Sequence, residues 1–298
     1  MYKENKIKMS TGERVFNVFN VIFMFVMMFV MFYPMWHVLC ASFSNAKQLS
    51  AHAGVLLWPD GYSLTAYKLM FKNPMILKGY GNTLYVLFFS MIINMVMTSI
   101  AAYVLSRKNV MLNKPITVFI IFTMYFNGGL IPTYLNVKSL GLIDSLWSII
   151  LPGAITTYNM VVLRTGFASV PDSLEESAKI DGASSLRILC QIILPLSKAT
   201  FMVVCMYYAV SHWNGWFYAM IYLNDRAKFP LQLILREILI QNDTSSMVGG
   251  DVAAGDSAYV SETVKYAVII ISIVPILCIY PYVQKHFTKG VMVGAVKG

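Results

Sequence analysis

The chain has 298 residues, of which 57% are hydrophobic and 12% are charged, and its formal net charge at pH 7 is +9. Soluble domains carry about 25% charged residues. Half that fraction, together with long uncharged runs, indicates a polytopic membrane protein and leaves no polar block large enough to form a soluble domain. Nucleic-acid binding explains the positive charge poorly, because no basic run exceeds two residues.

Six apolar segments approach the roughly 20 residues that a helix needs to cross the hydrocarbon core of a bilayer. They cover residues 17–39, 84–105, 116–131, 146–163, 199–223 and 266–283. Pro152-Gly153 interrupts the fourth and predicts a kink there, because proline lacks an N–H and clashes with the preceding turn. We therefore expect an all-α membrane protein with six transmembrane helices.

The distribution of lysine and arginine predicts the orientation of the chain. If the N-terminus lies inside, the inner segments hold 14 of the 23 basic residues. We expect a multi-pass membrane protein with two cytoplasmic ends, residues 1–16 and 284–298, and a membrane domain over 17–283. The first apolar run is too long for a cleavable signal peptide, and no small-residue cleavage site follows it closely.

Several shorter features complete the expected layout. Leu64–Phe71 can form an amphipathic helix on the membrane surface, and the outer segment 224–263 contains a stretch rich in Gly, Ser, Asp and Ala at 242–256, which predicts a loop. Asp251 and Asp256 in that loop lack EF-hand spacing, so we expect no metal site. The four cysteines show no paired spacing, which predicts four free, buried thiols rather than disulfides. They are Cys40, Cys190, Cys205 and Cys278.

A polar segment, residues 171–195, separates the fourth and fifth apolar runs. Pro171-Asp172-Ser173 predicts a helix start, with a capping box formed by Asp172 and Glu175 or by Ser173 and Glu176. Gly182 is placed to end this helix in a left-handed conformation. Ser184 or Ser185 can cap a second helix that ends at Leu194, before Pro195. The result is a helix-turn-helix elbow on the inner surface, and an ordinary solvated connection explains the same pattern equally well.

The elbow carries Glu176-x-Ala178, then Gly182, then Ile192-x-Leu194-Pro195, with Ser177 in place of the usual alanine. This pattern resembles the EAA motif of the permease subunits of bacterial ABC importers. Further segments are similar to the second permease of carbohydrate importers, and the insert after Pro230-Leu231-Gln232 resembles the Gram-positive subgroup for polysaccharide fragments. These segments are Asn127–Pro132, Trp213-Asn214 and Gly294–Gly298.

The resemblance implies a type I ABC importer fold in which the elbow inserts into a cytoplasmic ATPase and Glu176 forms an ion pair with it. It also implies partners: a second homologous permease, two ATPase subunits and an extracellular solute-binding lipoprotein. The chain has no Walker A pattern, so ATP and Mg would be bound by the ATPases, and the chain itself would be neither an enzyme nor a cofactor carrier. The residues implied in ATPase coupling are Glu175, Glu176, Ala178, Asp181, Gly182, Ile192, Leu194, Pro195, Gly294 and Lys297.

Sugars bind to aromatic faces and to amide and hydroxyl groups, so two polar-aromatic sets are candidates to line the pathway of an oligosaccharide. They are Tyr125, Asn127, Tyr158 and Asn159, and His212, Trp213, Asn214 and Trp216 together with Tyr218. An interfacial aromatic belt is the alternative for the second set. A single histidine in a span is more often a structural hydrogen-bonding residue, and in some relatives only the partner permease holds the substrate.

Three other functions stay open. An ion-coupled secondary transporter or facilitator is the main rival, although no Asp, Glu or Arg lies in the middle of a predicted span, where such a residue marks an ion pathway. An ABC permease for a solute other than a sugar fits the same motif. An intramembrane hydrolase is the least favoured, because no HExxH, GxSxG or Ser/His/Asp grouping is present.

Overall fold

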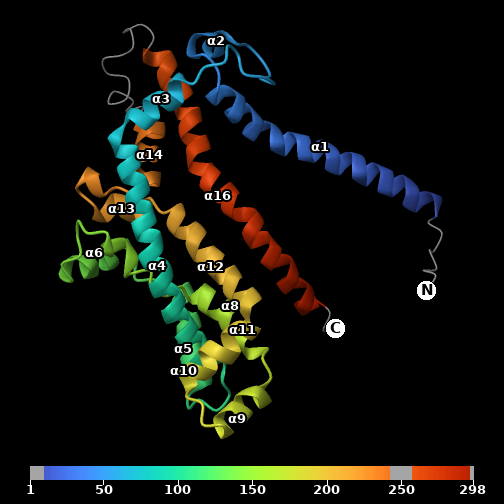
Figure 1. The fold of residues 1–298 in the computed structure, drawn as a ribbon, viewed down its shortest axis with the longest axis vertical. Helices are drawn as coiled ribbons and strands as arrows, with labels where there is room; N and C mark the ends of the chain where they lie inside the picture. Colours follow the sequence, from blue (N-terminus) through green and yellow to red (C-terminus); the bar gives the residue numbers. More distant parts are fainter. Residues whose placement is uncertain (1–9, 242–256, 296–298) are drawn as a thin grey trace. The chain divides into compact units, whose positions relative to one another are not determined.

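The computed structural model describes residues 10–241 and 257–295, and Figure 1 shows the path of the chain. Helices make up all the regular structure of these residues, without any strand, as the sequence predicted. The chain divides into two compact units, residues 1–72 with 244–270 and residues 73–243 with 271–298. Each unit is described by itself.

The first unit contains α1 (Thr11–Ser42), whose start is fixed by a capping box. The hydroxyl of Ser10 accepts the N–H of Glu13 at 3.2 Å, and the Glu13 carboxylate accepts the N–H of Ser10 at 2.7 Å. The helix is apolar on all sides, and none of its most apolar 18-residue window is buried within the chain. A helix that is apolar all round needs lipid or protein around it.

The end of α1 packs on the segment that follows it. Cys40, Ala41 and Leu56 form a small buried cluster against which Tyr266 of α16 (Ser257–Ala295) also packs. The short helix α2 (Ala46–Ala51) leads to α3 (Thr65–Lys72), which buries three apolar side chains on one face. The amphipathic helix predicted at 64–71 is therefore confirmed.

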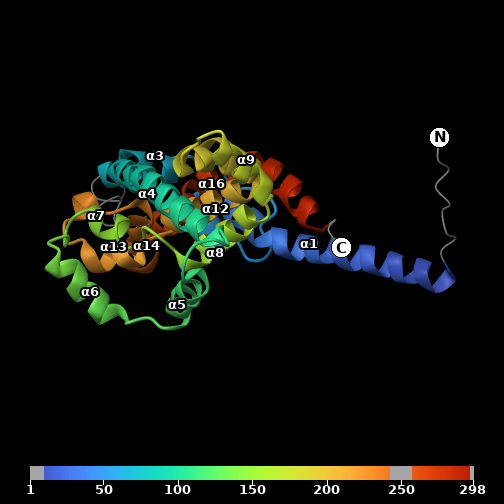
Figure 2. The same ribbon diagram turned by 90° about the horizontal axis from the view of Figure 1, so that it is seen from below.

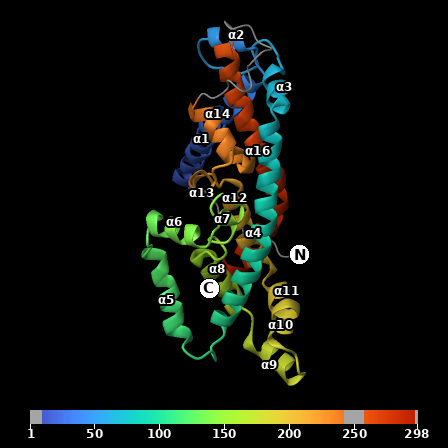
Figure 3. The ribbon, with the colours of Figure 1, turned by 90° about the vertical axis from the view of Figure 1, so that its left-hand side faces the viewer.

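The second unit is built on α4 (Pro74–Ser106), α8 (Thr157–Ala168) and α12 (Lys198–Trp213), which pack against one another (Figure 3). Their shared core includes the fully buried Leu163, Phe167 and Val204. Gly166 allows the close approach of α8 and α12, because a Cβ atom there would lie 2.7 Å from the side chain of Thr200. Real Cβ contacts are longer, so a larger residue at 166 must push the helices apart.

The remaining helices surround this group. They are α5 (Asn113–Tyr125), α6 (Leu130–Ser139), α7 (Trp147–Ile150), α13 (Phe217–Tyr222), the 3₁₀ turn η2 (Arg226–Lys228) and α14 (Leu231–Gln241). Figure 2 shows α5 and α6 joined by an extended link, and their axes differ by 110°. Gly129, with φ of +90°, lies in this link.

Not all of the six expected spans are single helices in the structure. Among the described residues, three helical stretches are long and apolar enough to cross a membrane, Thr11–Ser42, Pro74–Ser106 and Tyr259–Cys278, and the number rises to five if two bent pairs each count as one span. The fourth predicted span is broken rather than kinked, because residues 151–156, around Pro152-Gly153, leave the helical path and α8 keeps only 12 residues. The fifth stops at Trp213, and α13 begins at Phe217.

Other local predictions have mixed outcomes. All four cysteines are free, but only Cys40 is buried and Cys205 half-buried, whereas Cys190 and Cys278 are exposed, so the prediction of burial was wrong for two. The outer segment predicted at 224–263 contains η2, α14 and the start of α16. The loop predicted at 242–256 lies outside the described residues. Helix α16 continues through Gly294 to Ala295, and Lys297 lies outside the described part.

Candidate functional site

The elbow, residues 171–197, begins with α9 (Asp172–Ile180). Pro171 is the N-cap residue, and no side chain caps the helix. Both predicted capping boxes are therefore wrong, and the carboxylates of Asp172 and Glu175 bind basic side chains instead. Asp172 pairs with Lys108 at 3.0 Å, and this hydrogen bond lowers the pKa of the Asp172 carboxyl. Acidic residues in the first turn still complement the helix dipole.

The end of α9 forms the turn that the sequence predicted. Gly182 has φ of +78°, its N–H donates to the carbonyl of Lys179 at 3.0 Å, and the N–H of Ala183 donates to the carbonyl of Ala178 at 2.9 Å. These two bonds make a Schellman motif, in which glycine avoids the steric cost of a left-handed backbone. The direction of the second helix is fixed at this residue.

The second arm begins at Ser184, whose hydroxyl accepts the N–H of Arg187 at 3.4 Å. It continues through α10 (Ser185–Ile188), a π-helical turn at Leu189–Ile193 and α11 (Leu194–Leu196). Pro195 therefore lies within the arm, and the predicted end at Leu194 was wrong. The arm meets α12 at an angle of 90°.

A buried ion cluster holds α9 against the end of α4. We name it the Arg107 cluster: Tyr103, Arg107, Glu175 and Lys179. Arg107 Nη1 lies 2.9 Å from Glu175 Oε2, Lys179 Nζ lies 2.8 Å from Glu175 Oε1, and the Tyr103 hydroxyl donates to the same oxygen at 3.2 Å. The side chains of Arg107 and Glu175 are each only 6% exposed. Buried charges are tolerated when they are paired in this way.

Arg107 also donates from Nη2 to the carbonyl of Phe167 at 2.7 Å, so one guanidinium connects α4, α8 and α9. In the sequence alone, Arg107 counts only among the basic residues that predict the orientation of the chain. A basic residue directly after a span and an acidic pair on the elbow were the available signals. Their pairing was not visible, because Arg107 and Glu175 are 68 positions apart.

Neighbouring glutamates on α9 have opposite surroundings. Glu175 faces the Arg107 cluster, whereas Glu176 is exposed. Ala178, Ile192 and Leu194 are partly buried and pack on the core of the second unit. The exposed face carries large apolar side chains, with Ile180 88% exposed and Leu186 66% exposed. Contacts with the core of the second unit therefore hold the elbow in place. Its exposed surface carries large apolar side chains and the carboxylate of Glu176.

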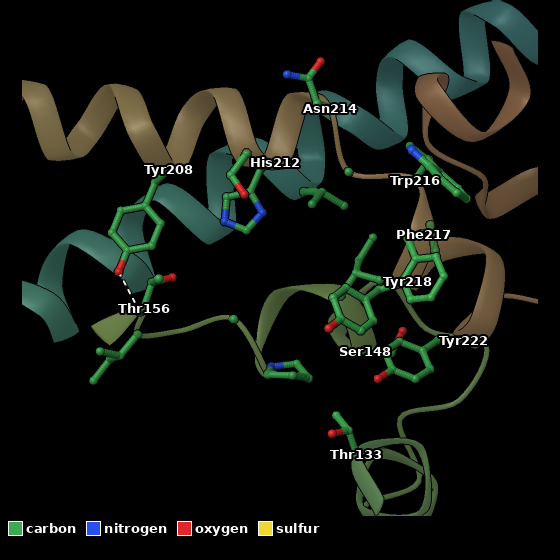
Figure 4. A pocket seen from close by; sticks show the side chains of 18 of the residues that line it. Thr133, Ser148, Thr156, Tyr208, His212, Asn214, Trp216, Phe217, Tyr218 and Tyr222 are labelled. Carbon is green, nitrogen blue, oxygen red and sulfur yellow. Dashed lines mark hydrogen bonds between the residues drawn. The ribbon is translucent and has the colours of Figure 1, made fainter. Parts of the chain in front are cut away.

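A cavity of about 780 Å³ lies elsewhere in the second unit (Figure 4). Its walls come from α4, the link between α5 and α6, residues 148–158, the end of α12, and residues 214–222. None of the described lining residues is Asp, Glu, Lys or Arg. The surface combines apolar side chains with hydroxyl, amide, imidazole and aromatic groups, which can hydrogen-bond to a polar solute and stack on a sugar ring.

The structure gathers part of the predicted pathway set at this cavity. Asn127, Tyr158, His212, Asn214 and Trp216 line it. Tyr125, Asn159 and Trp213 do not: Tyr125 is 81% exposed, and the other two are buried, with the indole N–H of Trp213 donating to the carbonyl of Ser272 at 3.1 Å. Several other lining groups were not predicted, since a tyrosine or threonine in an apolar run gives no signal of its own. They are Thr83, Thr156, Tyr208 and Tyr222, whereas Tyr218, predicted with the His212 set, does line the cavity.

Hydrogen bonds position two of the lining side chains. The hydroxyl of Tyr208 accepts the N–H of Thr156 at 2.9 Å, the bond dashed in Figure 4, and lies 2.8 Å from the hydroxyl of Thr98. The ring nitrogen Nε2 of His212 lies 2.8 Å from the amide nitrogen of Asn94. Both residues on α12 are thus tied to α4.

Asp144 fixes the chain beside the cavity wall. It has a left-handed backbone, with φ of +57°, and its carboxylate accepts the N–H groups of Asn224 and Asp225 at 3.0 Å and the ammonium of Lys228 at 2.7 Å. The hydrogen bond from Lys228, followed by those from the two N–H groups, lowers the pKa of Asp144 to about 2. These bonds connect the segment before α7 to the segment after α13. Helix α13 itself ends at Tyr222, which lines the cavity.

The chain matches, over residues 3–293, the family described as the inner membrane component of binding-protein-dependent transport systems. It is 40% identical to the polygalacturonan/rhamnogalacturonan transport system permease protein YtcP of Bacillus subtilis, over 96% of this chain and 99% of that protein. It is 38% identical to protein LplC of the same organism, over 96% of both chains.

Among solved structures, a bacterial ABC transporter that imports the acidic polysaccharide alginate matches with a TM-score of 0.85 and 29% identity, covering 95% of this chain and 100% of that one. The chain belongs to the family of permease subunits of binding-protein-dependent ABC transporters. Members of this family are non-catalytic membrane subunits. The resemblance seen in the elbow motif is therefore confirmed, as is the type I importer fold.

Proposed function

We propose that this chain is one permease subunit of an ABC importer that moves an acidic oligosaccharide, a fragment of a uronate-rich polysaccharide, into the cell. Two relatives support the substrate class, since one is named for polygalacturonan and rhamnogalacturonan and the other imports alginate. The observation that carries the proposal is the charge-free cavity of about 780 Å³ with its hydroxyl, amide and aromatic lining. A cavity of this size lies within the range of small-molecule sites.

The elbow is the proposed contact with a cytoplasmic ATPase. Glu176 is exposed, as are Ile180 and Leu186 on the same elbow, so it can enter a cleft and meet a basic residue, whereas Glu175 is paired with Arg107. Gly182 sets the angle between the two arms. The complete transporter would contain a second permease, two ATPases that bind ATP and Mg, and a solute-binding lipoprotein, with both termini of this chain in the cytoplasm.

The test is co-purification of the chain with the products of its neighbouring genes, followed by ATP hydrolysis in lipid nanodiscs with the binding protein and trigalacturonate. We expect sugar-stimulated hydrolysis by the wild-type complex. Glu176→Lys should abolish the stimulation while the chain stays in the membrane, because the substitution reverses the proposed ion pair. Ser139→Lys, which adds an exposed cation on α6, is the control and should hydrolyse ATP normally.

Two results would overturn the proposal. Normal sugar-stimulated ATP hydrolysis by the Glu176→Lys complex would show that the elbow does not couple the permease to the ATPase. A chain that purifies alone and moves solute into liposomes without ATP would be a facilitator or secondary transporter. Stimulation by a solute other than a sugar would keep the ABC permease and replace the substrate.

A further inference from the structure

His212 differs from the other groups that line the cavity. The described lining residues include no carboxylate, ammonium or guanidinium, and His212 carries the only imidazole among them. It extends from the last turn of α12 and its ring stands at the cavity in Figure 4. What the ring offers to a solute depends on which of its nitrogens holds the proton.

Asn94 determines the position of that proton. It is fully buried on α4, and its amide nitrogen Nδ2 lies 2.8 Å from Nε2 of His212. An amide nitrogen can only donate, so Nε2 accepts, and the neutral ring must carry its proton on Nδ1. The Nδ1 atom makes no hydrogen bond within the described part of the chain. Its N–H is therefore a donor that a solute in the cavity can use.

The unpaired half of the Asn94 amide argues against a purely structural role. Its oxygen Oδ1 is buried and has no hydrogen-bond partner among the described residues. An unsatisfied buried acceptor costs about 1–3 kcal/mol. A leucine of similar size would pack on α4 without that cost, so the benefit of Asn94 lies in its bond to His212.

The surroundings favour an anionic acceptor for this donor. The groups that stack on the ring or line the cavity beside it are uncharged: Tyr208 and Ser211 on α12, and Tyr218 on α13. Hydrogen bonds to a charged acceptor contribute about 1.5–3 kcal/mol, compared with about 0.5–1.5 kcal/mol for a neutral one. No carboxylate among the described lining residues competes for the N–H or repels an anion.

We propose that Asn94 is a positioning residue that holds His212 as an Nδ1–H donor to the carboxylate of a uronate unit in the cavity. This inference rests on the proposed import function and assigns its acidic selectivity to one pair of residues. Selectivity then arises within this chain, in addition to any that the binding protein supplies.

The test measures the equilibrium dissociation constants of trigalacturonate and of neutral galactotriose for the assembled complex in nanodiscs, without binding protein. Asn94→Leu should raise the constant for trigalacturonate about tenfold or more and that for galactotriose no more than about threefold. Ser90→Ala is the matched control: Ser90 lies one turn earlier on α4, is equally buried and also has an unpartnered oxygen, but it does not touch His212.

His212→Gln provides a second variant if Asn94→Leu does not assemble. Glutamine has a neutral N–H donor and, unlike histidine, no second tautomer. The variant should therefore keep part of the preference for trigalacturonate over galactotriose. The inference is wrong if wild type binds both trimers equally or neither, if Asn94→Leu weakens both to the same extent, or if Ser90→Ala has the same effect. Sugar-stimulated ATP hydrolysis with any of these results would leave the proposed import function intact.

Discussion

The Arg107 cluster allows a quantitative test of how the elbow is held in place. Arg107→Met removes the guanidinium from a site where both members of the ion pair are 6% exposed. Breaking a buried pair costs about 3–5 kcal/mol, because one charge stays buried without its partner. Lys179 remains 2.8 Å from Glu175 and reaches solvent, so we expect a loss near the lower limit, about 3 kcal/mol.

Hydrogen exchange at the amides of α9 measures this loss directly, in the complete complex and without global unfolding. A loss of about 3 kcal/mol corresponds to about a hundredfold lower protection. The control is Lys108→Met, which removes the neighbouring but 89% exposed partner of Asp172 and should change protection by about tenfold at most.

The double variant Arg107→Met/Glu175→Leu distinguishes the energy of the ion pair from the contribution of side-chain packing. Replacing both members of a buried pair by apolar groups is often neutral or stabilising. The double variant should therefore be more protected than Arg107→Met alone, with a coupling of about 2 kcal/mol. Equal protection of α9 in Arg107→Met and Lys108→Met would refute the cost assigned to the unpaired charge. So would losses of protection in Arg107→Met and Glu175→Leu that simply add in the double variant.

Two glycines give further predictions. Gly182→Val should destabilise the turn by about 1–2 kcal/mol or more and prevent stable binding of the ATPase, because a β-branched residue resists a φ of +78°; co-purification checks this, and normal assembly and transport would contradict it. Gly166→Leu should lower the thermal stability of the purified complex by several degrees, because its side chain meets Thr200, whereas Gly81→Leu on α4 meets open space and should not. Equal melting temperatures for these two variants would refute the packing argument.

Local features of the sequence predicted several structures correctly. These structures depend on residues that are close together in the sequence, so their spacing can be read directly. They are the left-handed turn at Gly182, the cap at Ser184 and the amphipathic helix α3. The elbow motif also identified the protein family. Where side chains had a choice of partner, local rules failed: Asp172 and Glu175 had the spacing of a capping box but bind Lys108 and Arg107 instead.

Composition determined that the chain is helical and membrane-embedded, because long uncharged runs leave few other places for so much apolar surface. It could not determine where those runs bend. The breaks at residues 126–129, 151–156 and 214–216 lie inside stretches that hydropathy alone scores as continuous. Neighbouring helices decide such breaks, because they supply the contacts and hydrogen bonds that a bent backbone needs.

The cavity and the Arg107 cluster were decided by tertiary structure alone. Arg107 and Glu175 are 68 positions apart, and Asn94 and His212 are 118 apart. Each of these side chains can satisfy its polar groups in many ways in an unfolded chain. Only the packing of α4 against α8, α9 and α12 selects one partner for each, and it does so because a polar group buried without a partner costs more than the ordering of its side chain.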